Sequence, residues 1–416
     1  MVRTVALGFA IIIASACGPG PTSDELTPSP PGTPARIASP TAERSATPMP
    51  TPSATATPEP TPRNTRVIVG IEFAVAPSPA DLRIETAISR DDEATIVATV
   101  AADIDAVQRD FDRRFSSRPA VYVFATNETY GLGLQRLFGY SAATAKFVAD
   151  NSVSFFEPSL LTIAANWQAI GDRRPIAAIR HELTHRLTLD ACAPRCDLVP
   201  AWLNEGEARL QEALVPGGDW RLLRVRYEAA SMAATETLIP LNTLVSQLSW
   251  NALTDWAGYY KYQEAARATE LLRADIGGET PIARLYDRLR RGENVAQAYS
   301  ALTSRSFDDF VASLGARMRE GLPRGPAIVT VATAPEGAGA SYLLYGFAPS
   351  STVSVTITSV HSTETWPLTV SPFGASFDGL GPERARGIYT ISVQYQGQVL
   401  TVKLTKSTAG AIGDLR

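Results

Sequence analysis

Two histidines and two glutamates in one stretch of the sequence could together hold a metal ion and use it. His181 and His185 are four residues apart in His-Glu-Leu-Thr-His, and Glu182 lies between them. Residues four apart lie one turn apart on a helix, so both imidazoles can bind one ion. Glu182 can reach a water molecule beside that ion without binding the ion itself. The spacing predicts a hydrolytic metal site, and Glu205, twenty residues beyond His185, is the candidate third ligand.

Two helices joined by a short loop would position these residues. Pro175 is suited to the first position of the first helix, and Pro200 to the start of the second. Glu207 and Glu212 follow Glu205 on the second helix, and we expect them to line a solvated face rather than bind metal. Three- and four-residue steps predict the buried stripe of the first helix, formed by Ile176, Ile179, Leu183 and Leu187.

The two-part motif resembles the gluzincin zinc metallopeptidases, the group that contains thermolysin and aminopeptidase N. His-Glu-Leu-Thr-His is followed by Trp-Leu-Asn-Glu-Gly-Glu-Ala, and in that group the Asn-Glu-Gly glutamate is the third zinc ligand. The resemblance implies one Zn²⁺ ion per chain, held by His181, His185 and Glu205. It also implies that Glu182 is the general base, and that the substrate is a peptide or a protein.

A downstream helix extends the resemblance, which covers roughly residues 90 to 320. Tyr262-Gln-Glu-Ala-Ala-Arg-Ala-Thr-Glu-Leu-Leu resembles the aminopeptidase helix whose leading tyrosine hydrogen-bonds the tetrahedral oxyanion. Tyr262 is therefore the implied donor. A shift of one turn would favour Tyr259 or Tyr260 instead, and an ordinary packed tyrosine is the other interpretation.

The sequence departs from the group at two places. The Gly-x-Met-Glu-Asn segment with which aminopeptidases hold a substrate's free amine is absent from the sequence, which favours an endopeptidase. Thermolysin-like chains carry an aspartate four residues after the zinc glutamate, where it orients a histidine. Arg209 stands at that position here, so the group that orients His181 is an open question.

Cys192 and Cys196 lie in the loop between the two motif helices. The chain has three cysteines, so two remain if Cys17 is lipidated. In an oxidising compartment a disulfide that closes this short loop and rigidifies the approach to Glu205 is the main interpretation. A second zinc site is the other.

The first seventeen residues predict export from the cytoplasm. A positive charge at Arg3, a short apolar run and small residues before Cys17 resemble a bacterial lipoprotein signal, in which that cysteine is lipidated. An ordinary secretory signal is the alternative. Residues 18 to 66 repeat Thr-Pro and contain little that could be buried, so we expect a disordered stalk. The protein is therefore expected outside the cytoplasm, lipid-anchored to a bacterial membrane or secreted.

The remaining sequence predicts an α+β protein. Residues 67 to 322 would form a zincin-like catalytic domain: a small mixed sheet, the motif helix and a C-terminal helical bundle. Its expected strands are 65 to 76, 119 to 125 and 160 to 164, and its expected helices are 91 to 115, 126 to 138, 262 to 275, 281 to 291, 294 to 302 and 307 to 319. The strand at 160 to 164 is either an edge that pairs with an extended peptide or an internal strand.

Short alternating runs then predict an all-β, immunoglobulin-like sandwich over residues 327 to 406, followed by a loose tail over 407 to 416. A spacer or binding role is expected for this module, with His361 exposed. The net charge of −4 gives no basic excess for nucleic acid. The main hypothesis is a cell-surface zinc metallopeptidase; the alternative is an inactive peptidase-like adhesion protein whose sandwich is the binding module.

Overall fold

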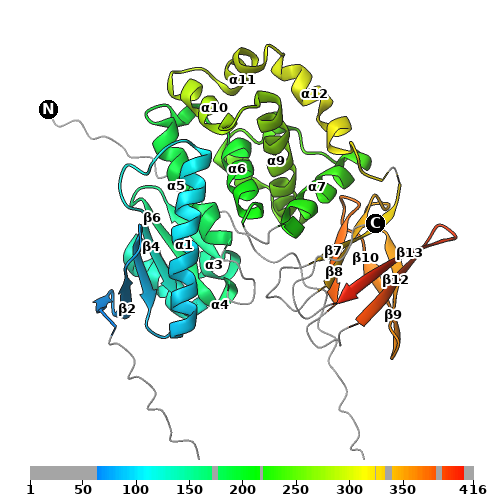
Figure 1. Cartoon of the computed structure of the whole chain (residues 1–416), viewed down its shortest axis with the longest axis horizontal. Helices are drawn as coiled ribbons and strands as arrows, with labels where there is room; N and C mark the ends of the chain where they lie inside the picture. Colours follow the sequence, from blue (N-terminus) through cyan, green and yellow to red (C-terminus); the bar gives the residue numbers. More distant parts are fainter. Residues whose placement is uncertain are drawn as a thin grey trace, which may run out of the picture.

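A computed structural model describes residues 63–170, 177–215, 219–323, 325–332, 340–380 and 387–406. These residues form a six-stranded sheet with helices on it, a helical bundle and a C-terminal β unit (Figure 1). The chain therefore has the expected α+β organisation. The signal segment, nearly all of the expected stalk, the tail and Pro175 lie outside the described residues. In the part of the chain that is described, no helix has the length and apolar character needed to cross a membrane.

The six-stranded sheet is mixed, with the strand order β1-β2-β3-β4-β6-β5. Neighbours β3, β4 and β6 pair in parallel, whereas β1, β2 and β5 pair antiparallel to their neighbours. The strands are β1 (Thr65–Ile68), β2 (Ile71–Ala76), β3 (Asp81–Glu85), β4 (Ala120–Phe124), β5 (Ser154–Glu157) and β6 (Thr162–Asn166).

Two strand predictions need correction. The single strand expected over residues 65 to 76 is a hairpin, because Val69 and Gly70 both adopt positive φ angles, of 50° and 84°, and reverse the chain. Strand β3 was not expected at all. The strand expected at 160 to 164 is β6, and it is internal, because it lies between β4 and β5. The edge strand beside it is β5.

Helices cover both faces of this sheet. One face packs against α1 (Arg90–Asp110) and α5 (Ala177–Cys192). Ser89 is the N-cap of α1, and its side chain accepts a hydrogen bond from the backbone amide of Asp92. The other face packs against α2 (Asn127–Phe138) and α3 (Ala142–Asn151). The short α4 (Trp167–Ile170) follows β6.

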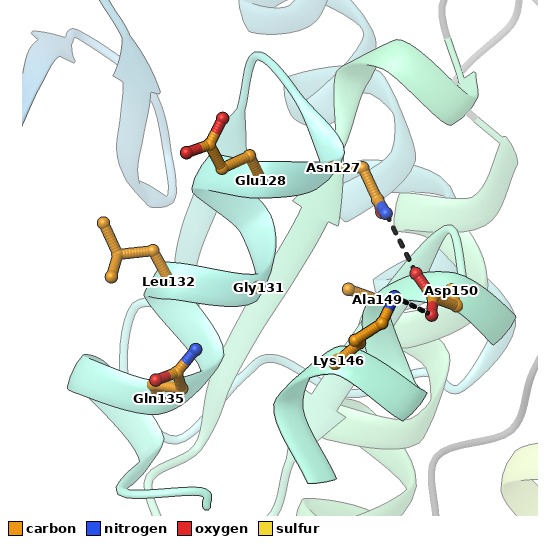
Figure 2. Close-up of a pocket in the computed structure, with 8 residues that line it drawn as sticks. All are labelled: Asn127, Glu128, Gly131, Leu132, Gln135, Lys146, Ala149 and Asp150. Atoms are coloured by element: carbon orange, nitrogen blue, oxygen red, sulfur yellow. Dashed lines mark hydrogen bonds and ion pairs between the residues drawn. The ribbon is translucent and has the colours of Figure 1, made fainter. Parts of the chain in front are cut away.

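A surface hollow of about 380 Å³ lies between α2 and α3 (Figure 2). Its walls include Lys146, whose ammonium lies 2.7 Å from Oδ2 of Asp150, and Asn127, whose amide donates to Oδ1 of the same carboxylate. The hollow is on the face of the sheet opposite α5, because α2 and α3 pack on that face. It therefore takes no part in the predicted metal site.

The helical bundle follows the motif. Its helices are α6 (Ala201–Ala213), α7 (Asp219–Ala234), α8 (Gln247–Ala252), α9 (Asp255–Ile276), α10 (Pro281–Arg290), α11 (Val295–Thr303) and α12 (Phe307–Met318). The expected helices are present, although α9 begins at Asp255 rather than Tyr262. In Figure 1, α9 runs through the bundle between α6 and α7.

The C-terminal β unit contains two antiparallel sheets, with the orders β10-β9-β12-β13 and β11-β8-β7. The strands are β7 (Ala327–Ala332), β8 (Ala340–Tyr345), β9 (Thr352–Thr358), β10 (Thr363–Thr369), β11 (Ser376–Leu380), β12 (Gly387–Tyr395) and β13 (Gln398–Lys406). Side chains from both sheets share one core, so the unit is a two-layer sandwich. His361 is exposed, as predicted.

Candidate metal centre

Helix α5 lies between the six-stranded sheet and the bundle, which determines where its polar residues point. Ile179 and Leu183 pack into the core of the sheet, whereas Leu187 packs into the core of the bundle. His181 and His185 occupy the remaining face, toward α6. Both histidines are buried, with 1% and 9% of their surface exposed. The apolar stripe therefore positions the two imidazoles, as the spacing predicted.

The predicted ligands come together at one point. Nε2 of His181 lies 3.1 Å from Nε2 of His185. Oε2 of Glu205, on α6, lies 3.7 Å from the first of these nitrogens and 3.5 Å from the second. These three residues are a group that could hold a metal ion, and all of them are buried.

These distances fit a tetrahedral metal ion. A zinc ion with ligands at 2.0–2.1 Å places any two ligand atoms about 3.3 Å apart. The separations of 3.1, 3.5 and 3.7 Å bracket this value. Two nitrogens and one carboxylate oxygen are also the donor set of catalytic zinc sites, which keep a fourth position for water or substrate. The residues therefore fit zinc.

Neighbouring side chains fix the orientation of two of the ligands. Oδ1 of Asn204 lies 3.1 Å from Nδ1 of His185. Because an amide oxygen only accepts, Nδ1 carries the proton and Nε2 presents its lone pair toward the cluster. Oε1 of Glu205 accepts a hydrogen bond of 3.2 Å from the side-chain amide of Gln247, at the start of α8.

Glu212 stands behind the other histidine, contrary to the expectation that it is solvated. Its Oε2 lies 3.5 Å from Nδ1 of His181, and Arg209 holds its Oε1 at 2.5 Å. Glu205 and Glu212 are seven residues apart and so share one face of α6. This spacing was the signal in the sequence that could have identified the carboxylate. Arg209 stands at the position where an orienting aspartate was expected. Its guanidinium binds Glu212, and the Glu212 carboxylate lies beside His181.

The solvated face expected at Glu207 is also wrong, because that side chain is fully buried. Its Oε1 accepts from Arg273 on α9 at 2.8 Å and from Gln211 at 3.0 Å. Arg273 and Gln211 both bind Asp110 at the end of α1. Burial raises the pKa of Glu207 to about 7, against the opposing effect of Arg273. This buried network ties α6 to α9 and α1.

Glu182, the predicted base, is held from the edge of the sheet. The hydroxyl of Ser154, on β5, donates a hydrogen bond of 2.8 Å to Oε1 of Glu182. Both side chains are buried, with 3% and 4% of their surface exposed. Burial raises the pKa of Glu182, while His181 and His185 oppose the rise. Ser154 lies outside every sequence motif and was not predicted.

The carboxylates around the cluster of His181, His185 and Glu205 favour the binding of a cation there. Burial lowers the pKa of His181, but the carboxylates of Glu205 and Glu212 outweigh burial and raise it to about 10. Burial also raises the pKa of Glu205, yet His185 and His181 hold it well below its usual value. The site therefore favours positive charge beside its imidazoles, as a metal-binding site requires.

Of the three candidate tyrosines, Tyr262 is the one that packs beside His181, with ring centroids 6.3 Å apart. Its ring also meets Trp250 edge-on, at 4.9 Å. The hydroxyl of Tyr259 donates to Glu228, and that of Tyr260 donates to the backbone oxygen of Ala375. Those two contacts direct their hydroxyls to partners other than the metal cluster.

Cys192 and Cys196 form a disulfide between α5 and α6. Both cysteines line a small cavity of about 140 Å³. Asn204 and Gln247, which contact His185 and Glu205, line the same cavity. The disulfide loop is therefore packed beside the side chains that orient the ligands.

Comparison of the chain with known protein families and with curated protein sequences gave no match.

Proposed function

We propose that this protein is a zinc-dependent peptidase of the gluzincin type. His181, His185 and Glu205 hold one zinc ion, and Glu182 is the general base. The observation that carries the proposal is the convergence of two imidazole nitrogens and one carboxylate oxygen in a buried cluster. The mixed sheet, α5 and the bundle support the zincin-like arrangement that the motif resemblance implies.

The chain's own residues provide the proton transfers of peptide hydrolysis. When bound, zinc supplies a Lewis acid that polarises a carbonyl and lowers the pKa of water. Glu182 removes a proton from the attacking water and passes it to the leaving amine. Ser154 holds the Glu182 carboxylate in place for both transfers. Tyr262 donates a hydrogen bond to the oxygen on which negative charge develops.

The edge of the sheet provides a place for an extended peptide. Strand β5 is the last strand on its side, so its outer edge has no strand partner among the described residues. An extended peptide that adds to this edge gains main-chain hydrogen bonds. Ser154 lies on β5 and contacts Glu182, so the peptide backbone would lie beside the general base. This arrangement suits cleavage within a chain, which is endopeptidase activity.

The export signal and stalk support action outside the cytoplasm, with Cys17 as the lipidated residue and the membrane as the anchoring partner. The C-terminal unit is proposed to be an immunoglobulin-like module, on the basis of its two antiparallel sheets. The alternative function, an inactive surface adhesion protein, is less favoured because the three ligands, the base and a serine that holds the base all lie together.

The test is zinc content and peptide cleavage of the purified protein, compared with Glu182→Gln. We expect about one zinc ion per chain in both proteins, and cleavage of an unstructured peptide by the wild type. The variant should lose activity by a factor of about 10²–10⁴, because it lacks the general base. Full cleavage by the variant would rule out the mechanism. A wild type that binds no zinc would rule out the function.

A further inference from the structure

The C-terminal β unit packs firmly against the bundle. Ala230, on α7, shares an apolar cluster with Leu343 and Tyr345 of β8. The ring of Tyr227 meets that of Tyr345 edge-on at 5.7 Å. The guanidinium of Arg224 also lies 4.1 Å from the ring centroid of Phe377 on β11. Contacts of this kind along a whole helix fix the unit relative to α7.

One turn of the β unit, residues 371–375, packs against α7 and α9 of the bundle; we term it the docking turn. The hydroxyl of Tyr260 donates to the backbone oxygen of Ala375 at 3.3 Å, and its ring lies 5.0 Å from that of Phe373. Gly374 has a φ of +74°, and a Cβ there would lie only 2.5 Å from Cγ2 of Thr235, just after α7. The turn therefore leaves no space between itself and the bundle.

The helix that the docking turn contacts faces the metal cluster on its other side. Tyr260 and Tyr262 are two residues apart on α9, so their side chains project about 200° apart. Tyr260 contacts the docking turn, and Tyr262 packs beside His181. Helix α9 therefore lies between the docking turn and the metal cluster.

Helix α9 also packs closely against α6, the helix that carries Glu205. A Cβ added to Gly206, on α6, would lie 2.5 Å from the backbone oxygen of Ala265 on α9. The two helices thus touch through their backbones at the residue next to Glu205. Movement of α9 away from α6 would open this contact, which lies beside Glu205.

We propose that the β unit is a brace for the metal centre: its docking turn holds α9 against α6, and so keeps Glu205 and Tyr262 in place. Gly374 and Tyr260 are positioning residues that act through α9. This inference rests on the proposed zinc peptidase function. In place of the spacer or independent binding role expected from the sequence, it gives the β unit an indirect contribution to metal binding, through α9.

The test uses the full-length protein and adds one side-chain carbon, which we term the wedge, to the interface between the docking turn and the bundle. Gly374→Ala introduces a Cβ that meets Thr235 and also lies 2.8 Å from the backbone oxygen of Phe347, so it should displace the docking turn from the bundle. We expect zinc affinity to fall about tenfold, as for loss of other groups that support metal ligands. We also expect kcat to fall while KM changes little. A competing chelator reports zinc affinity independently of activity.

Two further variants make the test specific. Thr235→Ser removes Cγ2, the nearest atom to the wedge, and keeps the hydroxyl, so it should partly restore zinc affinity to Gly374→Ala. Val399→Thr alters a side chain of β13 that is 63% exposed, and should change neither zinc affinity nor kcat. If Gly374→Ala does not fold, Tyr260→Phe takes its place, because it removes one hydroxyl and keeps the ring. Tyr260→Phe should lower zinc affinity and kcat as well, but by less than Gly374→Ala.

The outcomes separate the brace from the proposed function. The brace is overturned if amide hydrogen exchange of residues 371–375 becomes faster in Gly374→Ala or Tyr260→Phe while zinc affinity and kcat stay at the wild-type values. It is also overturned if Val399→Thr weakens zinc binding as much as the wedge does. A wild-type protein that neither binds zinc nor cleaves peptides contradicts the proposed function itself, on which the brace depends.

Discussion

Oε2 of Glu212 lies 3.5 Å from Nδ1 of His181, on the imidazole nitrogen opposite the one that faces Glu205. Glu212 is two helical turns beyond Glu205, so one face of α6 supplies both a candidate ligand and the carboxylate that orients another ligand. Arg209 binds Glu212 at 2.5 Å and keeps it ionised. A histidine whose Nδ1 proton faces a carboxylate has a fixed ring orientation and a more basic Nε2.

Glu212→Ala should weaken zinc binding by a factor of about 10–100, the usual effect of removing a group that orients a metal ligand. Glu212→Gln keeps an oxygen acceptor without the charge. Its zinc affinity should lie between those of Glu212→Ala and the wild type. Competition with a chelator of known affinity measures the change. Glu320→Ala, which removes an exposed carboxylate, is the matched control. Unchanged affinity in Glu212→Ala would show that His181 needs no such support.

Ser154→Ala should lower kcat by a factor of about ten, because a hydrogen bond to a charged group is worth about 1.5–3 kcal/mol. Zinc affinity should not change, since the Ser154 hydroxyl contacts the proposed base Glu182 and the backbone oxygen of Ala178. Steady-state kinetics with an unstructured peptide gives the measurement. In a Glu182→Gln background the same substitution should have no further effect on kcat, because Ser154 acts through Glu182. Additive losses in the double variant would contradict this role.

Gly206→Ala should destabilise the fold by about 1–3 kcal/mol, the usual cost of overpacking, because the new Cβ meets the backbone of α9. Urea unfolding followed by circular dichroism measures the free energy of unfolding. Gly315→Ala, in α12, is the matched control: its Cβ would lie 3.5 Å from Leu238, which is an ordinary contact. That substitution should stabilise the protein slightly, since alanine favours helix more than glycine. Equal effects of the two substitutions would exclude a close crossing of α6 and α9.

Glu264→Gln should change how stability depends on pH. Burial raises the pKa of Glu264 to about 8, against the opposing hydrogen bond from the backbone amide of Ile239. A carboxyl with a raised pKa in the folded state stabilises the protein most below its unfolded pKa. This contribution is lost as the pH rises from 4.5, the ordinary pKa of a glutamate, through about 8.

The variant has no such loss, and its amide oxygen can still accept from Ile239. Relative to the wild type, it should therefore gain stability between pH 5 and pH 9, on the order of 4 kcal/mol. Urea unfolding of both proteins at pH 5, 7 and 9 makes the comparison. Parallel pH profiles for the two proteins would mean that Glu264 does not titrate in this range.

Local patterns in the sequence predicted the parts of the structure that depend on local spacing. The histidines are brought together because they lie one helical turn apart, and α6 begins after Pro200 because proline favours the start of a helix. The helices α10, α11 and α12 likewise follow from apolar periodicity and capping residues. These features need no knowledge of distant parts of the chain.

The features that the sequence did not predict depend on tertiary packing. Glu207 and Glu212 were expected to be solvated because the side chains that they contact, Arg273 and His181, belong to other helices. Ser154 contacts Glu182 only because β5 packs beside α5. The hairpin at Val69 was missed because a β-branched residue rarely adopts a positive φ. The docking of the β unit has no local signal at all.

The strand order of the mixed sheet puts β1 and β5 at opposite edges. The chain enters the sheet at β1, and β5 closes the opposite side, with β2, β3, β4 and β6 between them. Neighbouring strands are about 4.8 Å apart, so five intervals put roughly 24 Å between the two sides. The described chain thus begins at the side of the sheet opposite β5, the edge proposed above to accept an extended peptide.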